Sequence, residues 1–187
     1  SAHLSSSTDN ELMIQVRDGD VKKLGVLFER HSTRLLNFFS RYTNKPDASE
    51  DLVQDVFFRI LKYRQTYRGE APFTVWMYQL ARNASADYFR KRKEQSMSDE
   101  DMEHQPDPDP LPTEAYQQSE EHEMLRQALA RLSTEKREVL VLSRYQDLRY
   151  EEIGRILDCP VGTVKARVHF ALKDLRDEYM KLTRTKV

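Results

Sequence analysis

Small, cationic and hydrogen-bonding side chains share one face of a helix that we expect from about Gly162 to Met180. A short helix predicted at Tyr150–Asp158 and a tight turn at residues 159–162 precede it, which is the layout of a helix-turn-helix. Such side chains suit a helix that enters the major groove of DNA. The alternative is an ordinary helical hairpin with a solvated basic face. The face consists of Gly162, Ala166, His169, Phe170 and Lys173, with Lys165 and Arg167 at its flanks.

A second polar stripe lies on a helix predicted from about Phe73 to Lys93, opposite the face of Trp76. Its cations suit phosphate groups, and its amide and guanidinium groups suit base edges. A basic run at residues 90–93 follows directly. The alternative is a charged helix face beside aromatic core residues. The stripe is Gln79, Arg82, Asn83, Ala86 and Arg90, and the aromatic residues that could stack on unpaired bases are Tyr67, Phe73, Tyr78 and Phe89.

An aromatic residue is expected on the outer face of the third predicted helix. Opposite its apolar stripe lie Asp51, Gln54, Asp55, Phe58 and Lys62. An exposed aromatic side chain ringed by polar groups is typical of a protein-binding hot spot. Equally, Phe58 could pack on the N-terminal helix.

The sequence predicts no enzyme, because no set of residues has the spacing of a catalytic or metal site. The carboxylates between Asp47 and Asp55 could be imagined as a magnesium cluster, but helix capping and solvation explain most of them. The five histidines are scattered without the spacing of metal ligands, and no glycine-rich phosphate loop is present. The single cysteine, Cys159, abuts a turn proline with no partner histidine in evidence, so we expect a small apolar filler. We therefore expect no catalytic, cofactor or metal site.

The charges are distributed in three blocks that cancel to a net charge of −1. Residues 1–93 carry a net +5, residues 94–123 a net −11 and residues 124–187 a net +5. Such asymmetry favours nucleic-acid contact by the basic blocks. The centre of the acidic block, residues 106–112, contains four prolines, which disfavour a helix. We expect a flexible acidic linker there.

The apolar periodicity predicts an all-α protein of two small helical domains joined by that linker. Helices are expected at Asp9–Arg17, from about Val21 to Tyr42, and from a cap at Asp47 or Ser49 onward, and Ser133-Thr134 is expected to cap a helix of the second domain. The residues expected in the core are Leu52, Val53, Val56, Phe57, Ile60 and Leu61 of the third helix, Phe73, Trp76, Met77, Leu80, Ala84 and Tyr88 of the fourth, and Val164, Val168, Ala171 and Leu175 of the last. We place the first domain at residues 9–94, the linker at 95–117 and the second domain at 118–182. No apolar run is long enough to span a membrane and no secretory signal shows at residues 1–7, so a cytoplasmic location is expected.

Three motifs, in order along the chain, resemble those of extracytoplasmic-function (ECF) sigma factors. Residues 47–57 (DASEDLVQDVF) are similar to the segment that binds core RNA polymerase. Residues 67–78 (YRGEAPFTVWMY), with Ala81-Arg82-Asn83, resemble the promoter-melting region. Residues 159–168 (CPVGTVKARV) resemble the recognition helix of the second domain.

The resemblance implies a bacterial transcription initiation subunit without a cofactor, whose partners are core RNA polymerase, promoter DNA and an anti-sigma factor. The loop Tyr67–Pro72 would receive a base flipped from the non-template strand, and the acidic linker would run through the interior of the polymerase. The implied polymerase contacts are Asp51, Leu52, Gln54, Asp55 and Phe58. The implied minus-ten contacts are Tyr67, Arg68, Phe73, Gln79, Arg82, Asn83 and Arg90. The implied minus-thirty-five contacts are Thr163, Lys165, Ala166, Arg167, His169, Phe170 and Lys173.

The chain departs from residues common in that family at Ala166, Phe170 and Leu172, where many members carry Ser, Arg and Arg. We expect Phe170 to contact either a thymine methyl group or the sugar backbone. Two other functions are compatible with parts of the sequence. A stand-alone helix-turn-helix repressor or activator would leave the Asn83 stripe and Phe58 unexplained. A metal-dependent nuclease that uses the carboxylates between Asp47 and Asp55 is the least favoured of the three functions.

Overall fold

The computed structural model of the protein describes residues 6–98 and 120–184. In both ranges the regular structure is helical, without a strand, which confirms the predicted fold class. The chain divides into two compact units, one formed by residues 1–39 and 47–100 and the other by residues 40–46 and 101–187. Within the described ranges no helix combines the length and the apolar character needed to cross a membrane.

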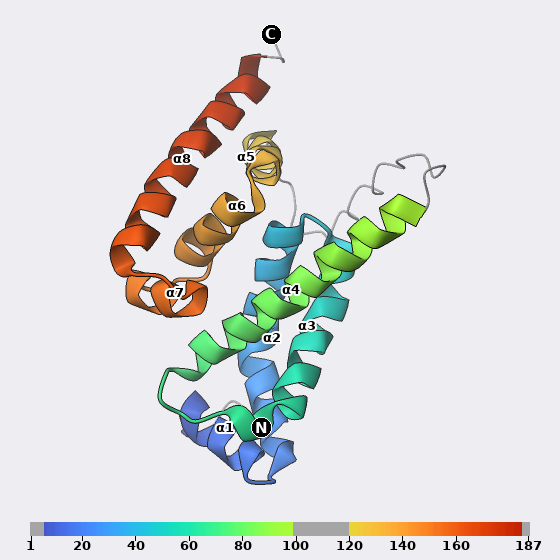
Figure 1. Cartoon of the computed structure of the whole chain (residues 1–187), viewed down its shortest axis with the longest axis vertical. Helices are drawn as coiled ribbons and strands as arrows, with labels where there is room; N and C mark the ends of the chain where they lie inside the picture. The colour runs from blue at the N-terminus through green and yellow to red at the C-terminus, as the bar shows by residue number, and fades with distance from the viewer. Residues whose placement is uncertain (1–5, 99–119, 185–187) are drawn as a thin grey trace. The chain divides into compact units, whose positions relative to one another are not determined.

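In the first unit α2, α3 and α4 lie alongside one another, and α1 lies at the end of this bundle where α4 begins (Figure 1). Short 3-10 turns, η2 and η3, come before α2 and after α3. The elements are α1 (Asp9–Arg17), η2 (Val21–Lys23), α2 (Leu24–Thr43), α3 (Pro46–Lys62), η3 (Arg64–Thr66) and α4 (Phe73–Ser98).

Two helix limits in this unit differ from the sequence prediction. Helix α3 begins at Pro46, and Ser49, expected as a cap, is a fully buried residue inside the helix. The reason is that proline suits the first turn, where its missing amide donor has no intrahelical partner anyway. Helix α4 continues past Lys93 to Ser98, because the following residues include no proline before Pro106. The predicted linker at 95–117 lies outside the described residues from residue 99 onward.

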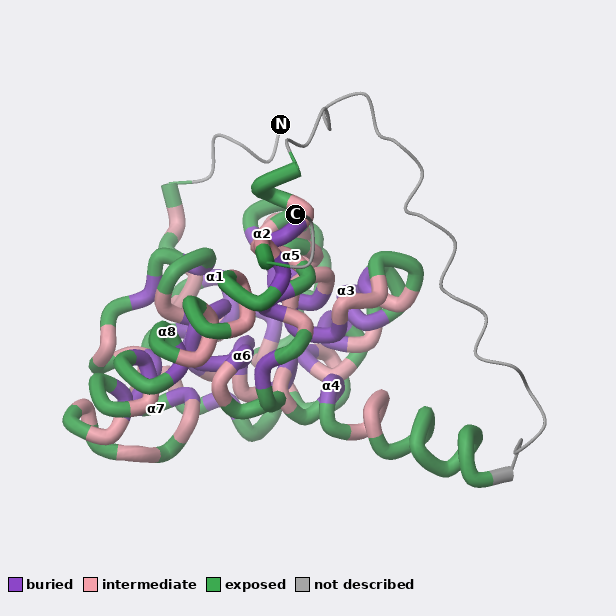
Figure 2. Tube along the Cα trace, turned by 90° about the horizontal axis from the view of Figure 1, so that it is seen from above, coloured by how far each residue is buried: buried purple, intermediate pink, exposed green. Residues whose placement is uncertain are grey.

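The core of the first unit follows the predicted apolar faces. In Figure 2 the inner faces of the bundle are buried, whereas the last turns of α4, residues 91–97, are exposed all round. Of the predicted α4 core, Trp76 and Tyr88 are only half-buried. The residues buried as predicted include Leu52, Val53, Val56, Phe57 and Ile60 of α3, and Phe73, Met77, Leu80 and Ala84 of α4.

The second unit is organised around one long helix, α8, which α5, α6 and α7 all contact (Figure 1). Ser133 caps α6 as predicted, since its hydroxyl accepts a hydrogen bond from the Lys136 amide. The elements are α5 (Glu120–Arg131), α6 (Thr134–Leu140), the π-helical turn η4 (Val141–Tyr145), α7 (Tyr150–Leu157) and α8 (Val161–Arg184).

Helices α7 and α8 form the predicted helix-turn-helix. Asp158 ends α7 in the left-handed conformation, with φ 55° and ψ 52°. Gly154 makes the turn possible, because a Cβ atom there would lie 2.7 Å from the carbonyl oxygen of Cys159. Val164 and Val168 of α8 are buried, as their spacing predicted. The opposite face of α8 is consequently turned away from the core.

Candidate functional site

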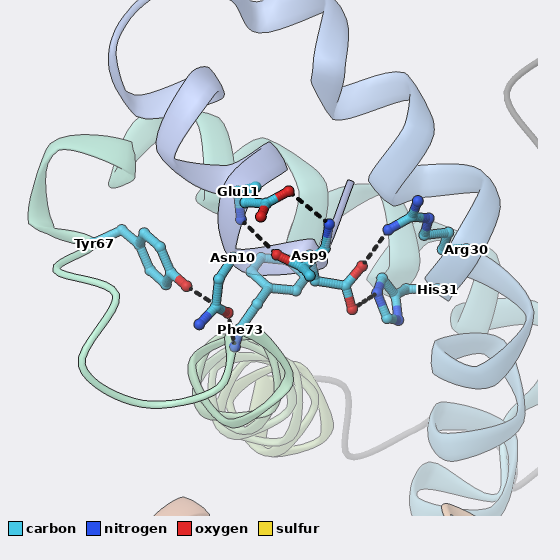
Figure 3. Close-up of polar contacts among 8 residues, drawn as sticks. Asp9, Asn10, Glu11, Arg30, His31, Tyr67 and Phe73 are labelled. Atoms are coloured by element: carbon cyan, nitrogen blue, oxygen red, sulfur yellow. Dashed lines mark hydrogen bonds and ion pairs between the residues drawn. The ribbon is translucent and has the colours of Figure 1, made fainter. Parts of the chain in front are cut away.

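A single side chain of α1 holds both ends of the loop between η3 and α4. The Asn10 Oδ1 atom accepts a hydrogen bond from the Tyr67 hydroxyl at 2.9 Å and another from the Phe73 amide at 2.7 Å (Figure 3). The Phe73 amide belongs to the first turn of α4, where amide groups have no partner within the helix. Asn10 therefore caps α4 from another helix and fixes the loop at residues 67–72.

Further contacts between α1 and this segment support the same arrangement. Arg17 donates from its Nη1 atom to the carbonyl oxygen of Tyr67 at 3.2 Å, and the Gln65 side-chain amide donates to the carbonyl oxygen of Arg17 at 3.0 Å. Gly69 sits at φ 76°, a conformation that favours glycine. Arg68, between these anchors, is exposed.

Asp9 ties α1 to α2 on the other side of Asn10. Its carboxylate accepts a hydrogen bond from Arg30 at 3.0 Å and lies 2.9 Å from the Nε2 atom of buried His31 (Figure 3). Burial alone would raise the pKa of Asp9, but the contacts with His31 and Arg30 outweigh it and hold that pKa below the usual value. The ionised carboxylate is thus part of the frame that supports the loop.

Two residues predicted to contact unpaired bases lie in the core instead. Tyr67 is 3% exposed and Phe73 is 1% exposed, with their ring centroids 6.3 Å apart. Burial, assisted by the negative charge of Asp9, raises the pKa of Tyr67 to about 12. The faces of these rings, and of fully buried Tyr78, are covered, so they are not exposed to an unpaired base in this structure. The apolar periodicity of α4 explains the burial of Phe73, whereas Tyr67 is held in the core by its contacts with Asn10 and Arg17.

The polar stripe of α4 is formed as predicted. Asn83, Ala86 and Arg90 are exposed, and Gln79 and Arg82 are half-buried. The four basic residues at 90–93 are all exposed and continue the stripe along the helix. The stripe starts from the same helix end that Asn10 fixes.

An ion-pair network that the sequence did not reveal connects this stripe to α3. Arg59 bonds to Asp55 on its own helix at 3.1 Å and to Asp87 of α4 at 2.7 Å, and Asp87 in turn pairs with Arg90 at 2.8 Å. The Arg59 contact lowers the pKa of Asp87. The spacing of Asp55 and Arg59, four residues apart, was a signal for the first pair. The pairing across helices depends on packing alone.

The outer face of α3 exposes an aromatic ring. Phe58 is 62% exposed, so within the described residues it does not pack against the N-terminal helix. Asp51 and Gln54 beside it are also exposed, and Asp55 is half-buried. Leu52, in contrast, is 5% exposed and packs in the core of the first unit, although the resemblance implied it as a polymerase contact.

The outward face of α8 presents the residues predicted for DNA contact. Lys165, Ala166, His169, Phe170 and Lys173 are exposed. Thr163 and Arg167 are half-buried, and the Nε atom of Arg167 lies 3.2 Å from a carboxylate oxygen of Glu135 in α6. Lys136 of α6 likewise pairs with Asp174 of α8. No spacing in the sequence indicates these contacts, which hold the outward face of α8 against the start of α6.

Comparisons with known proteins identify both units. The family model described as Sigma-70 region 2 matches residues 27–95, and the one described as Sigma-70, region 4 matches residues 122–175. The ECF RNA polymerase sigma-E factor of Haemophilus influenzae is 28% identical over 184 residues, which cover 94% of this chain and 97% of that relative. The chain is an ECF sigma factor of the sigma-70 family.

Other sigma factors extend this finding. The ECF RNA polymerase sigma-E factor of Escherichia coli is 27% identical over 186 residues, which cover 95% of this chain and 97% of that relative. The solved structure of the sigma factor RpoE from Bartonella quintana, in complex with the anti-sigma factor NepR, matches with a TM-score of 0.68 and 25% identity over 84% of this chain and 96% of that chain. The protein is thus an RNA polymerase sigma factor. A stand-alone helix-turn-helix regulator is not favoured, because region 2 accounts for the first unit.

Proposed function

We propose that this sigma factor divides promoter recognition between its two units, with α4 and the preceding loop opening the minus-ten element and α8 reading the minus-thirty-five element. The observation that carries the proposal is that each unit exposes one helix face of DNA-binding chemistry, at Asn83–Arg90 of α4 and at Lys165–Lys173 of α8. The domain limits that we propose are residues 9–94 and 118–182, with a linker between them.

The minus-ten element is opened, in this proposal, along α4. Arg82, Arg90 and the basic run at its end bind phosphates of the strand, and Asn83 bonds to the edge of an unstacked base. The loop at residues 67–72 receives the displaced base, with Arg68 as its exposed cation. Because Tyr67 and Phe73 are buried, they act as positioning residues that hold the loop and the start of α4.

The minus-thirty-five element is read by the N-terminal half of α8. Lys165 and Lys173 contact phosphates, while Ala166, His169 and Phe170 face the bases in the major groove. The modest net charge of each basic block means that the isolated chain should bind duplex DNA weakly. We expect tight binding to promoter DNA only from the complex with polymerase.

Core RNA polymerase docks on α3 through Phe58, Asp51, Gln54 and Asp55. The 62% exposure of Phe58 supports this role, since an aromatic side chain in water gains most from burial against a partner. We also infer that an anti-sigma protein holds the chain inactive, as the Bartonella quintana relative was solved with one. The chain acts as a regulator without catalysis, in the cytoplasm where bacterial RNA polymerase works.

The test is transcription with purified core RNA polymerase on genomic fragments. We expect promoter-specific transcripts that core polymerase alone does not make. Asn83→Ala should reduce open complexes, followed by permanganate reactivity of unpaired thymines, and leave binding to core polymerase unchanged. No increase in specific transcripts over core polymerase alone would refute the proposed function.

A further inference from the structure

The recognition face of α8 has an aromatic ring where a polar side chain would be expected. Phe170 is 56% exposed, and the ring of His169 lies against it in a T-shaped arrangement at a centroid distance of 5.4 Å. One exposed phenylalanine does not by itself mark a binding surface, but this ring also lines a groove on the outward face of α8. Its place on the helix that we propose to enter the major groove makes DNA the partner to consider first.

The surface in front of the ring forms a groove. Gly162, Ala166 and Phe170 follow one another at intervals of four residues along α8 and line this groove together with Thr163 and Arg167, and Glu135 and Lys136 of α6 complete its lining. A Cβ atom added to Gly162 would meet no atom within 4 Å, so the groove is open at that end. The small residues leave room for a group of DNA to reach the face of the Phe170 ring.

The apolar part of the groove, formed by Ala166 and Phe170, favours one base. Neither Phe170 nor Ala166 has a side chain that can form hydrogen bonds, so they cannot pair with the major-groove edges of guanine, adenine or cytosine. The 5-methyl group of thymine is the apolar group that unmodified DNA presents in the major groove. Exposed Lys165 and Lys173 beside the groove supply the positive charge that phosphates require, which favours DNA over an apolar protein partner.

Glu135 further restricts which bases the groove can bind. Its carboxylate lies 3.2 Å from the Nε atom of Arg167 and borders the same groove. The pair partly neutralises Arg167, which otherwise would be the residue best suited to bind guanine. Apolar contact therefore dominates base recognition at this point of the helix.

We propose, on the basis of the proposed function, that Phe170 and Ala166 form a specificity site for the 5-methyl group of a thymine in the minus-thirty-five element.

The experiment compares thymine with deoxyuridine, which lacks only the 5-methyl group. Templates with a randomised minus-thirty-five region are first selected by transcription with core polymerase and the full chain. Each thymine of the selected element is then replaced singly by deoxyuridine. At one position, we expect initiation to fall about threefold to fivefold, the effect of losing one buried methyl group. Replacement at the other positions should have little effect.

Matched variants assign the effect to the ring. For Phe170→Ala, initiation on the thymine and deoxyuridine templates should be equal within error. For Leu172→Ala, a change to another exposed apolar residue of α8 that does not line the groove, the threefold to fivefold difference should persist. Because Phe170 is exposed, circular dichroism of Phe170→Ala should match that of the wild-type protein.

Three results would overturn the inference: no thymine enriched in the selected element, no effect of deoxyuridine at any position, or an undiminished effect in Phe170→Ala. These results differ from failure of the proposed function, in which the wild-type chain would give no promoter-specific transcripts on any template. In that case the inference would fall with the function it rests on.

Discussion

Replacing Asn10 by alanine should destabilise both the loop at residues 67–72 and the first turn of α4. The side-chain oxygen of Asn10 accepts hydrogen bonds from the Tyr67 hydroxyl at 2.9 Å and from the Phe73 amide at 2.7 Å. Both donors are on residues that are almost fully buried, so water cannot readily replace the lost acceptor. Tyr67→Phe is the matched variant, because it removes only one of the two hydrogen bonds.

The size of the effect follows from these contacts. A donor left without an acceptor in a buried position costs about 1–3 kcal/mol, and two such donors cost about 2–6 kcal/mol. Alanine is the better helix former in α1, which offsets about 0.5 kcal/mol of this cost. We expect Asn10→Ala to lower the free energy of unfolding of the first unit by about 1.5–5.5 kcal/mol. Tyr67→Phe should lower it by about 1 kcal/mol, since it leaves no buried donor unpaired.

The single tryptophan provides the assay. Trp76 lies in α4 with its ring centroid 5.1 Å from that of Tyr67, so its fluorescence reports unfolding of the first unit. With a urea m-value of about 1.5 kcal/mol per molar, the midpoint of Asn10→Ala should shift down by about 1–3.5 M. Open-complex formation with core polymerase should fall, whereas the affinity for core polymerase should stay the same.

Asn10→Asp tests whether the acceptor is what matters. A carboxylate keeps an oxygen at the position of Oδ1 and is favourable in the first turn of α1. It should therefore retain most of the wild-type midpoint. An Asn10→Ala midpoint within about 0.3 M of the wild type, or an equal loss in Asn10→Asp, would refute the assignment of Asn10 as the cap of α4.

Three further variants test other contacts. Phe58→Ala should leave the urea midpoint unchanged and weaken co-migration with core polymerase. The neighbouring Phe57 is only 6% exposed, so Phe57→Ala should cost about 3–5 kcal/mol of stability. Equal behaviour of the two variants would contradict the predicted docking face. Gly154→Ala should destabilise the second unit by about 2–3 kcal/mol, because its Cβ atom would lie 2.7 Å from a backbone oxygen. Gly162→Ala, whose Cβ atom would meet no atom within 4 Å, should leave the thermal unfolding temperature unchanged or raise it slightly, because alanine is the better helix former. The contacts with His31 and Arg30 hold the pKa of Asp9 below its usual value in the folded protein, so the ionised form stabilises the fold above the usual pKa and this gain is lost as the pH falls through the lowered pKa. In urea titrations the stability difference between wild type and Asp9→Asn should therefore shrink as the pH is lowered from about 5 into the acid range, and a constant difference would exclude this linkage.

The apolar periodicity of the sequence determined the helical class and the inward faces of the helices. Val164 and Val168 of α8 and the apolar stripe of α3 are buried as predicted, since a period of 3.6 residues leaves one face for the core. The same periodicity identified the exposed faces by exclusion. Phe58 and Asn83 are exposed for that reason.

Local sequence chemistry also determined where α6 begins. The Ser133 hydroxyl accepts a hydrogen bond from the amide of Lys136, three residues along, and a serine at this position before a helix can be recognised from the sequence. The cap of α4 could not be predicted in this way. The Phe73 amide bonds to Asn10, which is 63 residues away, and no spacing in the sequence indicates this contact.

Tertiary packing decided which of the aromatic and charged residues are available to a partner. Tyr67 is buried because Asn10 and Arg17 hold it against α4, and Arg59 pairs with Asp87 because α3 and α4 pack together. Arg167 is held by Glu135 of another helix. These contacts depend on the distances between helices, which residue types and periodicity do not specify. The sequence therefore determined the two helices that we propose to contact promoter DNA, and the structure decided which of their side chains remain exposed.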